Sequence, residues 1–443
     1  MAYISSLIII LMYFYTLRKL PYIKSSKLFL GFFTLFVVRI IFSINHVISF
    51  KPIFAGQSLT SLSSLCTIFL VFTFMDKKYL RYKFIIPYYL IVISIFISAI
   101  YSGELMGGVV VLMKWLLLIV TSIALIQLFF KHGLVNTLKP FYYLFLGLFI
   151  CQLASVVLGQ GKDTEALNST SNSISYIAGY AHESAFSILL YTGLLISSVL
   201  MLKKDIKPIV PFLFIIGLVF ANYRTLLISA LIPLFCVYLA HLYMGSKKEV
   251  KLFVFGSATI SLLVFVMLFG VDVIDRFGEL GGALSNLGEL MSIDYSLFSF
   301  EERRLLSSRL FLWNMYLTEY SYFSFFGMLL GAGPEAWTNY FDVYAHNAYI
   351  AALFDLGIIG LCVFLGVLYS TFVFMLKIKD KKLKVILLGF LAGFLVMSSS
   401  TMPLWAVEGV HLYSFIFTIA YYLSTKKFNE SNVGKAFNQT LME

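Results

Sequence analysis

Long apolar stretches, separated by polar connections, run along most of the chain. Thirteen of them each hold the roughly 20 mostly apolar residues that an α-helix needs to cross a membrane. They are centred near Ile9, Phe36, Phe69, Ile93, Leu118, Gly147, Thr192, Ile215, Ile232, Val264, Val363, Phe390 and Phe415. Since a helix satisfies its own backbone hydrogen bonds in lipid, we expect an all-α polytopic membrane protein with about 12–13 transmembrane helices.

The composition supports a membrane protein and excludes a set of soluble domains. Of the 443 residues, 60% are hydrophobic and only 12% are charged, whereas soluble domains are roughly 25% charged. The four cysteines, Cys66, Cys151, Cys236 and Cys362, all lie in apolar stretches. Their placement indicates neither a disulfide framework nor a zinc site.

The net charge of +11 follows the topology of the chain rather than a nucleic-acid-binding surface. Most basic residues lie in alternate connections, at 18–27, 77–83, 131–139, 203–207, 247–251, 377–384 and 426–435. Basic connections face the cytoplasm in membrane proteins, so we expect the amino terminus outside and the carboxyl terminus inside. The first apolar stretch lacks a basic region before it and a cleavage site after it, so we expect a retained anchor rather than a signal peptide.

Two external connections are much longer than the others. One runs from about Gly159 to Glu183, and the other spans residues 271–347. We therefore expect four regions: a transmembrane bundle of about ten spans at 1–270, a large, partly helical external loop at 271–347, C-terminal transmembrane helices at 348–425, and a cytoplasmic tail at 426–443. Because loops held by a rigid scaffold often carry function, the site is expected in the large loop.

The large loop has an internal pattern of its own. The stretch Glu301–Tyr322 is predicted to form a helix, because apolar side chains recur every three to four residues. A glycine-rich turn follows at Gly327–Pro334, where the backbone can approach a ligand closely. The segment Tyr344–Tyr349 then leads the chain back into the membrane.

Several short motifs give the chain a family resemblance. The large loop carries Ser308-Arg309 with Trp313, then Gly331-Ala332-Gly333-Pro334, then His346-Asn347 leading into Leu356-Gly357-Ile358-Ile359-Gly360. Upstream lie Asn222-Tyr223-Arg224-Thr225 and Gly179-Tyr180-Ala181-His182-Glu183-Ser184. Together with the span pattern, these segments resemble the O-antigen polymerase and O-antigen ligase superfamily. The last motif is similar to one in some polysaccharide polymerases, with Ser184 where a proline is common.

The resemblance implies a GT-C-like glycosyltransferase in the bacterial inner (cytoplasmic) membrane, with a large periplasmic loop and an active site that faces the periplasm. The first expectation is a polymerase of oligosaccharide repeat units for an O-antigen or another surface polysaccharide. It would transfer the growing glycan en bloc, with inversion, from undecaprenyl diphosphate to a new lipid-linked unit. A chain-length regulator is a candidate partner, and nucleic acid is not expected to bind.

Two other functions remain open. An O-antigen ligase would use the same donor but would transfer the glycan to lipid A-core. A non-enzymatic flippase for the same lipid would need charges along a path through the bundle, and an inverted repeat would support it. The charges of this chain gather outside the spans instead, which disfavours a flippase.

Transfer from a lipid diphosphate needs cations for the leaving group. The external connections contain no Asp-x-Asp pair and no spacing of histidines and carboxylates typical of a metal site, so we expect a metal-independent enzyme without a cofactor. Arginine binds phosphate oxygens through two parallel hydrogen bonds, which makes Arg224 and Arg309 the first candidates. Arg303 and Arg304 are weaker candidates for substrate binding. Two further basic residues lie within spans, without a partner that the sequence identifies: Arg39 and Lys114.

The transfer also needs a group that takes the proton of the incoming hydroxyl. His346 is the first candidate, as this base or as a donor to the leaving phosphate, because histidine exchanges protons near neutral pH. Glu183 is the rival base, because desolvation at the outer edge of a span can raise the pKa of a carboxylate. The predicted substrate contacts beside them are Asn347, Trp313 and Tyr344, and the two aromatic rings offer stacking faces for sugars.

Overall fold

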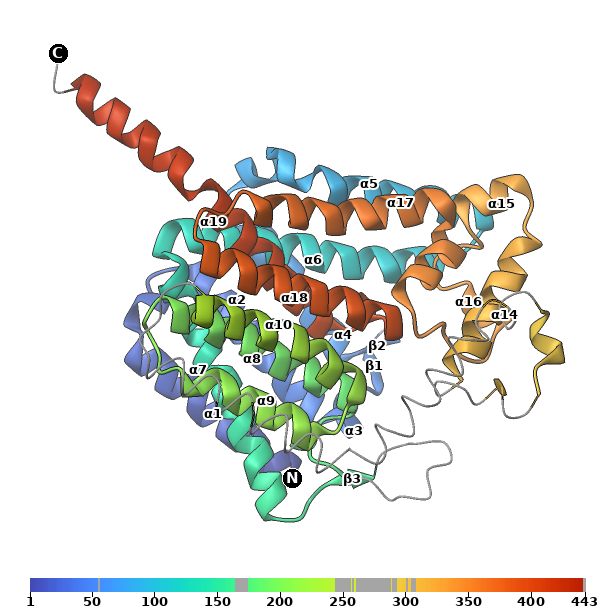
Figure 1. The fold of residues 1–443 in the computed structure, drawn as a ribbon, viewed down its shortest axis with the longest axis horizontal. Helices are drawn as coiled ribbons and strands as arrows, with labels where there is room; N and C mark the ends of the chain where they lie inside the picture. The colour runs from blue at the N-terminus through green and yellow to red at the C-terminus, as the bar shows by residue number, and fades with distance from the viewer. Residues whose placement is uncertain are drawn as a thin grey trace.

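The structure is a computed structural model that describes residues 1–54, 56–163, 174–243, 256, 259, 288, 293–299, 302–303 and 308–440. Nearly all regular structure in these ranges is α-helical, and the long helices pack as one bundle (Figure 1). The described strands form two short antiparallel hairpins, β1 (Pro52–Phe54) with β2 (Gln57–Ser58) and β3 (Lys162–Asp163) with β4 (Ile174–Ser175). The expected all-α class is confirmed.

Apolar stretches and capping residues set where the bundle helices begin and end. The bundle comprises α1 (Ala2–Lys19), α2 (Lys27–Ile44), α4 (Leu59–Phe74), α5 (Ile86–Ser102), α6 (Leu105–His132), α7 (Leu134–Val157), α8 (Glu183–Leu202), α9 (Ile209–Ala221), α10 (Arg224–Tyr243), α17 (Ala348–Leu376), α18 (Lys381–Ser400) and α19 (Val407–Thr440). Short helices between them are η1 (Pro21–Ile23), α3 (His46–Ser49), η2 (Lys77–Arg81), η3 (Lys83–Ile85) and η5 (Pro403–Trp405). Ser26, for example, caps α2 by accepting the N–H of Phe29. Each predicted apolar stretch falls on one of these helices, except the stretch near Val264, which lies outside the described residues.

Seven of the described helical segments are long and apolar enough to cross a membrane. They are Lys27–Ile44, Lys83–Ser102, Leu105–His132, Leu134–Val157, Glu183–Leu202, Ala348–Leu376 and Lys381–Ser400. The outward face of the bundle is also apolar, since Phe14 of α1 is 62% exposed and Phe96 of α5 is 57% exposed. Such exposed hydrophobic side chains suit contact with lipid rather than water, and these features together indicate a multi-pass membrane protein.

The core of the bundle lies around α8 and α19. Nearly every side chain of α8 is buried, as is most of α19 up to residue 420. Helix α8 packs against α7 and α9, and helix α19 packs against α6, α8 and α17. Phe141 meets Phe36 and Phe415 edge to face, with ring centroids 5.2 and 5.1 Å apart, an arrangement that aromatic quadrupoles favour. This core is the scaffold that holds the connections at both ends.

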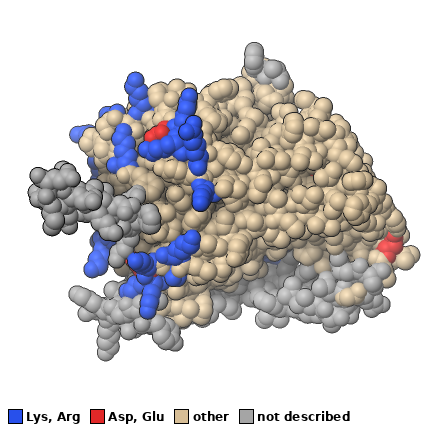
Figure 2. Space-filling model, turned by 90° about the horizontal axis from the view of Figure 1, so that it is seen from above, with Lys and Arg blue, Asp and Glu red and all other residues tan. Residues whose placement is uncertain are grey.

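Basic residues gather at one end of the bundle. Figure 2 shows Lys and Arg side chains concentrated at one end of the visible face, with a small acidic patch at the opposite end. The basic connections at 77–83 and 377–384 come together at the lysine-rich end, because residues of both border one pocket there. This grouping agrees with the predicted alternation of basic connections. Placement of the lysine-rich end in the cytoplasm stays a prediction.

The opposite end carries the segment that precedes α17. We call residues 308–347 the external segment; it contains α14 (Arg309–Ser321), α15 (Phe325–Leu330) and α16 (Trp337–Tyr340), and η4 (Tyr295–Leu297) precedes it (Figure 1). The single helix predicted at Glu301–Tyr322 is interrupted at Ser308, although Glu302 and Arg303 near its predicted start are helical. Ser308 has a φ of 64°, a left-handed conformation that interrupts a right-handed helix, so α14 begins at Arg309.

The glycine-rich turn of the external segment is hydrogen-bonded to α17. The N–H of Ala332 donates to the carbonyl of Phe354 over 2.8 Å, and the N–H of Gly333 donates to the carbonyl of Asp355 over 3.0 Å. Those two carbonyls are available because α17 departs from helical geometry just after them. The turn therefore replaces the hydrogen bonds that the helix gives up there.

Glycines make this close approach sterically possible. Gly357 kinks α17 with a φ of 68°, and a Cβ at this position would overlap the backbone of Leu329. Gly331 has a φ of 84°, and a Cβ there would overlap the backbone of Asp355. The close backbone approach that the sequence predicted for a ligand is therefore made to α17 itself.

Candidate functional site

The two helices that carry the predicted arginines begin at one place, at the end of the bundle opposite the lysine-rich end. Arg309 opens α14, and its Nη2 donates to Oγ1 of Thr225, 3.3 Å away. Thr225 follows Arg224, the first residue of α10. The contact joins two motifs that lie 84 residues apart in the sequence. Helix N-termini carry partial positive charge, so two of them beside a guanidinium suit an anion.

The rings of His346 and Tyr344 pack against each other beside this arginine, with centroids 4.1 Å apart and planes tilted by 38°. Burial lowers the pKa of His346 to about 4, and the nearby charge of Arg309 acts in the same direction. The imidazole is therefore neutral at pH 7 and can accept a proton. Burial also raises the pKa of Tyr344, so its phenol keeps its proton at neutral pH.

Asn347, the neighbour of His346, caps α17. Its Oδ1 accepts the N–H of Tyr349 at 2.9 Å and that of Ile350 at 3.2 Å. The residue is buried, and its side-chain carbonyl is committed to the start of the helix. The predicted substrate contact by Asn347 would therefore have to use the NH₂ group of its side chain.

Glu183 is the first residue of α8 and lies close to Lys162. The distance from Nζ of Lys162 to Oε1 of Glu183 is 3.6 Å. The same Nζ donates to the carbonyl of Ala181 over 3.0 Å, which holds the lysine over the motif. The carboxylate of Glu183 therefore already has a cationic partner within the protein, and His346 remains the first candidate for the base.

Tyr223 links the glutamate motif to the arginine. Burial raises its pKa, and the charges of Arg309 and Glu183 act on it in opposite directions. The phenol of Tyr344 also acts on it, which places all these groups in one neighbourhood. We call Arg309, Thr225, Tyr223, Tyr344 and His346 the arginine–histidine cluster. The sequence assigned no role to two members of this cluster, Thr225 and Tyr223, although both lie in the motif around Arg224.

Glu408 anchors the motif that precedes Glu183. Its Oε1 accepts hydrogen bonds from the hydroxyls of Tyr180 and Ser43, each over 3.3 Å. Glu408 is 5% exposed, and the two hydroxyls satisfy a carboxylate that would otherwise be costly to bury. Sequence reasoning missed this residue, although an acidic side chain at the edge of an apolar stretch is itself a signal.

Two of the predicted substrate contacts are engaged within the protein. Nε of Arg303 donates to the carbonyl of Phe298 over 3.0 Å, and its Nη2 donates to that of Ser296 over 3.3 Å. Trp313 packs in the small apolar cluster around Phe298. These contacts give both residues a structural role, and they do not support the predicted role in substrate binding. Arg304 lies outside the described residues.

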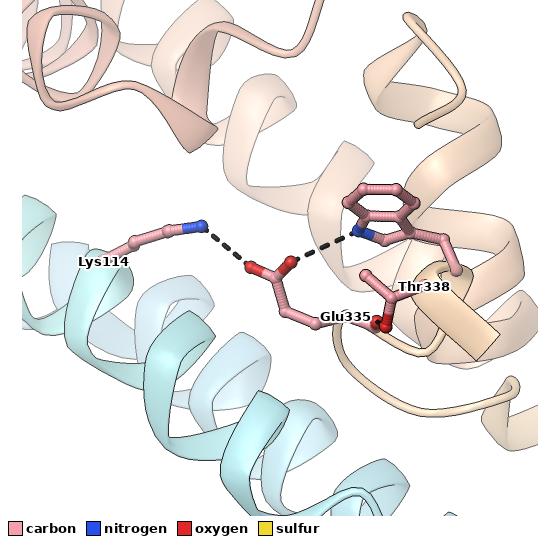
Figure 3. Close-up of polar contacts among 4 residues, drawn as sticks. Lys114, Glu335 and Thr338 are labelled. Atoms are coloured by element: carbon pink, nitrogen blue, oxygen red, sulfur yellow. Dashed lines mark hydrogen bonds and ion pairs between the residues drawn. The ribbon is translucent and has the colours of Figure 1, made fainter. Parts of the chain in front are cut away.

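Lys114, for which the sequence identified no partner, pairs with the external segment (Figure 3). Its Nζ lies 2.9 Å from Oε1 of Glu335, and Oε2 of that carboxylate accepts the indole N–H of Trp337 at 3.2 Å. The hydroxyl of Thr338 donates to the backbone carbonyl of Glu335 over 3.1 Å. The ammonium also lies 4.6 Å from a ring centroid of Trp405, within cation–π range. This group of contacts ties α6 to the external segment.

A row of aromatic rings runs from this ion pair to His346. Trp405 lies 6.3 Å from both Trp337 and Tyr344, measured between ring centroids, and Tyr344 packs against His346. A cavity of about 60 Å³ borders Trp405 and the buried Asp355, and Oδ1 of Asp355 has no hydrogen-bond partner within the described part of the chain. The cavity has room for water but not for a sugar ring. Sugar stacking would therefore use the outer faces of the rings.

Three residues at this site have left-handed backbone conformations. Asn222, Ser308 and His346 have φ values of 51°, 64° and 48°. Each such conformation costs about 1–2 kcal/mol for a residue with a side chain. The surrounding fold holds the backbone against this cost at the motifs that carry the two arginines and the histidine. Strain of this kind clusters at binding and catalytic sites.

Over the described ranges, His, Cys, Asp and Glu side chains form no group of three that could hold a metal ion. No protein-family model matches the chain, and no curated protein matches it significantly. The chemistry of the site therefore rests on the residues that meet at the arginine–histidine cluster.

Proposed function

We propose that the chain is a membrane glycosyltransferase of GT-C-like architecture that acts on a glycan linked to undecaprenyl diphosphate. The observation that carries the proposal is the arginine–histidine cluster, in which Arg309 meets the start of α10 beside the neutral imidazole of His346. A guanidinium and two helix N-termini attract phosphate oxygens, and a neutral histidine can take a proton. The motif resemblance supports the same chemistry.

In the proposed reaction, a hydroxyl of the acceptor sugar attacks the anomeric carbon of the donor glycan. A C–O bond forms at this carbon while its bond to the phosphate oxygen breaks, and undecaprenyl diphosphate leaves with the electron pair. His346 takes the proton of the attacking hydroxyl, and Arg309 and Arg224 stabilise the charge of the diphosphate. The negative charge of the bound diphosphate raises the proton affinity of His346 and opposes the effect of burial.

The proposed acceptor is a second lipid-linked repeat unit, which makes the chain a polymerase of surface polysaccharide. Support comes from the motif around Glu183, which is similar to a polymerase motif. The charge of Glu183 also acts on Tyr223, a member of the arginine–histidine cluster. In this proposal the cluster faces the periplasm, and the lysine-rich end faces the cytoplasm. A ligase would use the same donor chemistry and differ only in its acceptor.

The surface glycan of a strain that lacks the gene tests the proposal. Loss of a polymerase leaves a single repeat unit on the core, whereas loss of a ligase leaves no unit. Loss of a flippase instead leaves the donor in the cytoplasmic leaflet, which side-specific lipid labelling detects. A ladder of normal length in the deletion strain would refute all three functions.

Complementation of that strain tests the site. Arg309→Ala should lower glycan polymerisation by roughly 10²–10³-fold, because a group that stabilises transition-state charge is removed. Arg18→Ala, which removes an exposed arginine at the lysine-rich end, serves as the matched control and should restore the wild-type ladder. Restoration by Arg309→Ala and by His346→Ala would contradict the catalytic assignment.

A further inference from the structure

A large pocket lies at the lysine-rich end of the bundle, opposite the arginine–histidine cluster. Its volume is about 980 Å³, and it is bordered by η2, η3 and the ends of α6 and α17, with α19 beside them. Small-molecule pockets commonly measure about 300–1,000 Å³, so this pocket has room for a sizeable ligand. Nothing in the proposed transfer reaction uses it.

The rim of the pocket is basic. Lys78, Arg81, Lys83 and Lys377 line it, and none of its lining residues is acidic. Lys78 pairs with Asp76 over 2.7 Å. The other three cations have no ion pair with a described carboxylate, and all three are exposed. Their combined positive potential is available to an anionic ligand.

The floor of the pocket is aromatic. Phe84, Phe130, Phe374 and Tyr421 line it. The ring centroid of Tyr421 lies 4.5 Å from that of Phe84 and 5.1 Å from that of Phe374, so these three rings form a continuous surface. Phe84, Phe130 and Phe374 belong to the ends of three segments that are long and apolar enough to cross a membrane. At such ends, lipid head groups meet acyl chains.

We infer that this pocket binds an anionic phospholipid, whose phosphate lies among Arg81, Lys83 and Lys377 and whose acyl chain lies along the aromatic floor. A soluble phosphate compound would use the rim but would leave the apolar floor without a partner. A zwitterionic lipid would use the floor but would gain less from the cations. Only an anionic lipid matches both parts. This inference does not depend on the proposed glycosyltransferase activity.

Native mass spectrometry of the full-length protein in detergent tests the inference. The protein is titrated with phosphatidylglycerol and, separately, with phosphatidylcholine, and we expect it to retain the first in preference. The triple variant Arg81→Ala, Lys83→Ala, Lys377→Ala should bind phosphatidylglycerol more than about tenfold more weakly, because each basic side chain contributes to the attraction. The replaced residues are exposed, so the thermal unfolding midpoint should stay at the wild-type value.

A matched triple variant separates the pocket from the general surface charge. Lys24→Ala, Lys27→Ala, Lys379→Ala removes the same charge from exposed residues of basic connections that do not line the pocket. It should bind phosphatidylglycerol within about twofold of the wild-type affinity. Equal weakening in both triple variants would overturn the inference, as would equal retention of the two lipids by the wild type. Displacement of phosphatidylglycerol by excess inorganic phosphate would assign the pocket to a soluble anion instead.

Discussion

His346 is a residue whose protonation the fold sets directly. Burial and Arg309 lower its pKa to about 4, whereas a histidine in an unfolded chain has a pKa of about 6.5. Between these two values the unfolded chain binds a proton that the folded protein does not. The stability that the neutral imidazole contributes is therefore fully present above about pH 6.5 and is lost as the pH falls toward about 4.

This linkage gives a prediction that does not depend on enzymatic activity. Between about pH 7.5 and pH 5, the wild-type protein should lose more thermal stability than His346→Gln, which cannot take up the proton. The measurement is the unfolding midpoint in detergent at each pH. His182→Gln replaces an exposed histidine and should keep the wild-type pH dependence. If His346→Gln shows the same pH dependence as the wild type, the imidazole is not buried in its neutral form.

Single residues of the site were predictable from their motifs, but their partners were not. The motifs pointed to Arg224 and His346 at the edges of apolar stretches, and to Arg309 in the predicted helix of the large loop. The partner of Lys114 lies 221 residues away in the sequence. Tyr180 and Glu408 are 228 residues apart. Such contacts follow from the path of the external segment and from helix packing, which a local hydrophobic pattern does not encode.

The ion pair between Lys114 and Glu335 connects two elements, α6 and the external segment. Its side chains are 26% and 21% exposed, so water screens the pair less than it screens a surface pair. A double-mutant cycle with Lys114→Met and Glu335→Gln should give a coupling free energy of about 1–2 kcal/mol in detergent unfolding. The pair is only partly buried, which keeps the expected value below that of a fully enclosed pair.

The pair Lys203–Asp380 provides the control for this cycle. Its atoms are 3.6 Å apart and its side chains are 34% and 46% exposed. The same cycle on this pair should give a coupling below about 0.5 kcal/mol, as is usual for exposed ion pairs. Equal couplings for the two pairs would mean that Lys114 does not hold the external segment against the bundle.

The kink of α17 gives a prediction on the stability of that helix. Gly357→Ala should destabilise the protein by about 2–4 kcal/mol, because alanine disfavours the left-handed conformation and its Cβ overlaps the backbone of Leu329. Gly366→Ala in the same helix is the matched control, since a Cβ there has no atom within 4 Å. It should leave stability unchanged or raise it by up to about 1 kcal/mol. Denaturant unfolding in detergent measures both, and similar values would contradict the close backbone approach.

At the scale of elements, the positions of helices were easier to predict than their ends. Membrane-length apolar stretches become helices because lipid offers no other partner for backbone N–H and C=O groups. Sequence periodicity predicted one continuous helix over Glu301–Tyr322, whereas the structure interrupts it at Ser308 and begins α14 at Arg309. The difference comes from the left-handed backbone of Ser308. A serine in a sequence does not indicate this conformation, whereas a glycine often does.

The whole molecule has one lysine-rich end and one end that holds the arginine–histidine cluster, and this asymmetry predicts its orientation in the membrane. In a variant without the four native cysteines, Thr338→Cys should react with a membrane-impermeant maleimide in intact spheroplasts. Lys379→Cys should react only after the membrane is permeabilised. Both positions are exposed in the fold, so each can react when the reagent reaches it. The reverse labelling pattern would place the cluster in the cytoplasm and contradict the proposed function.

At this scale, the alternation of basic connections was the most informative feature of the sequence. It predicted that the basic residues would gather at one end of the bundle, and they do so in the structure. The pocket at that end could not be anticipated, because Phe130, Phe374 and Tyr421 come from three different helices. Their convergence depends on how α6, α17 and α19 pack against one another.

The junction between the glycine-rich turn and α17 is made by main-chain atoms. It depends on three glycines, Gly331, Gly333 and Gly357, whose φ values of 84°, 113° and 68° disfavour any residue with a side chain. The hydrogen bonds of this junction run between backbone groups, so they do not depend on the identity of the other side chains, provided that the three glycines remain. Under the proposed function, the surface of the external segment can then change to recognise different sugars while its attachment to the bundle stays the same.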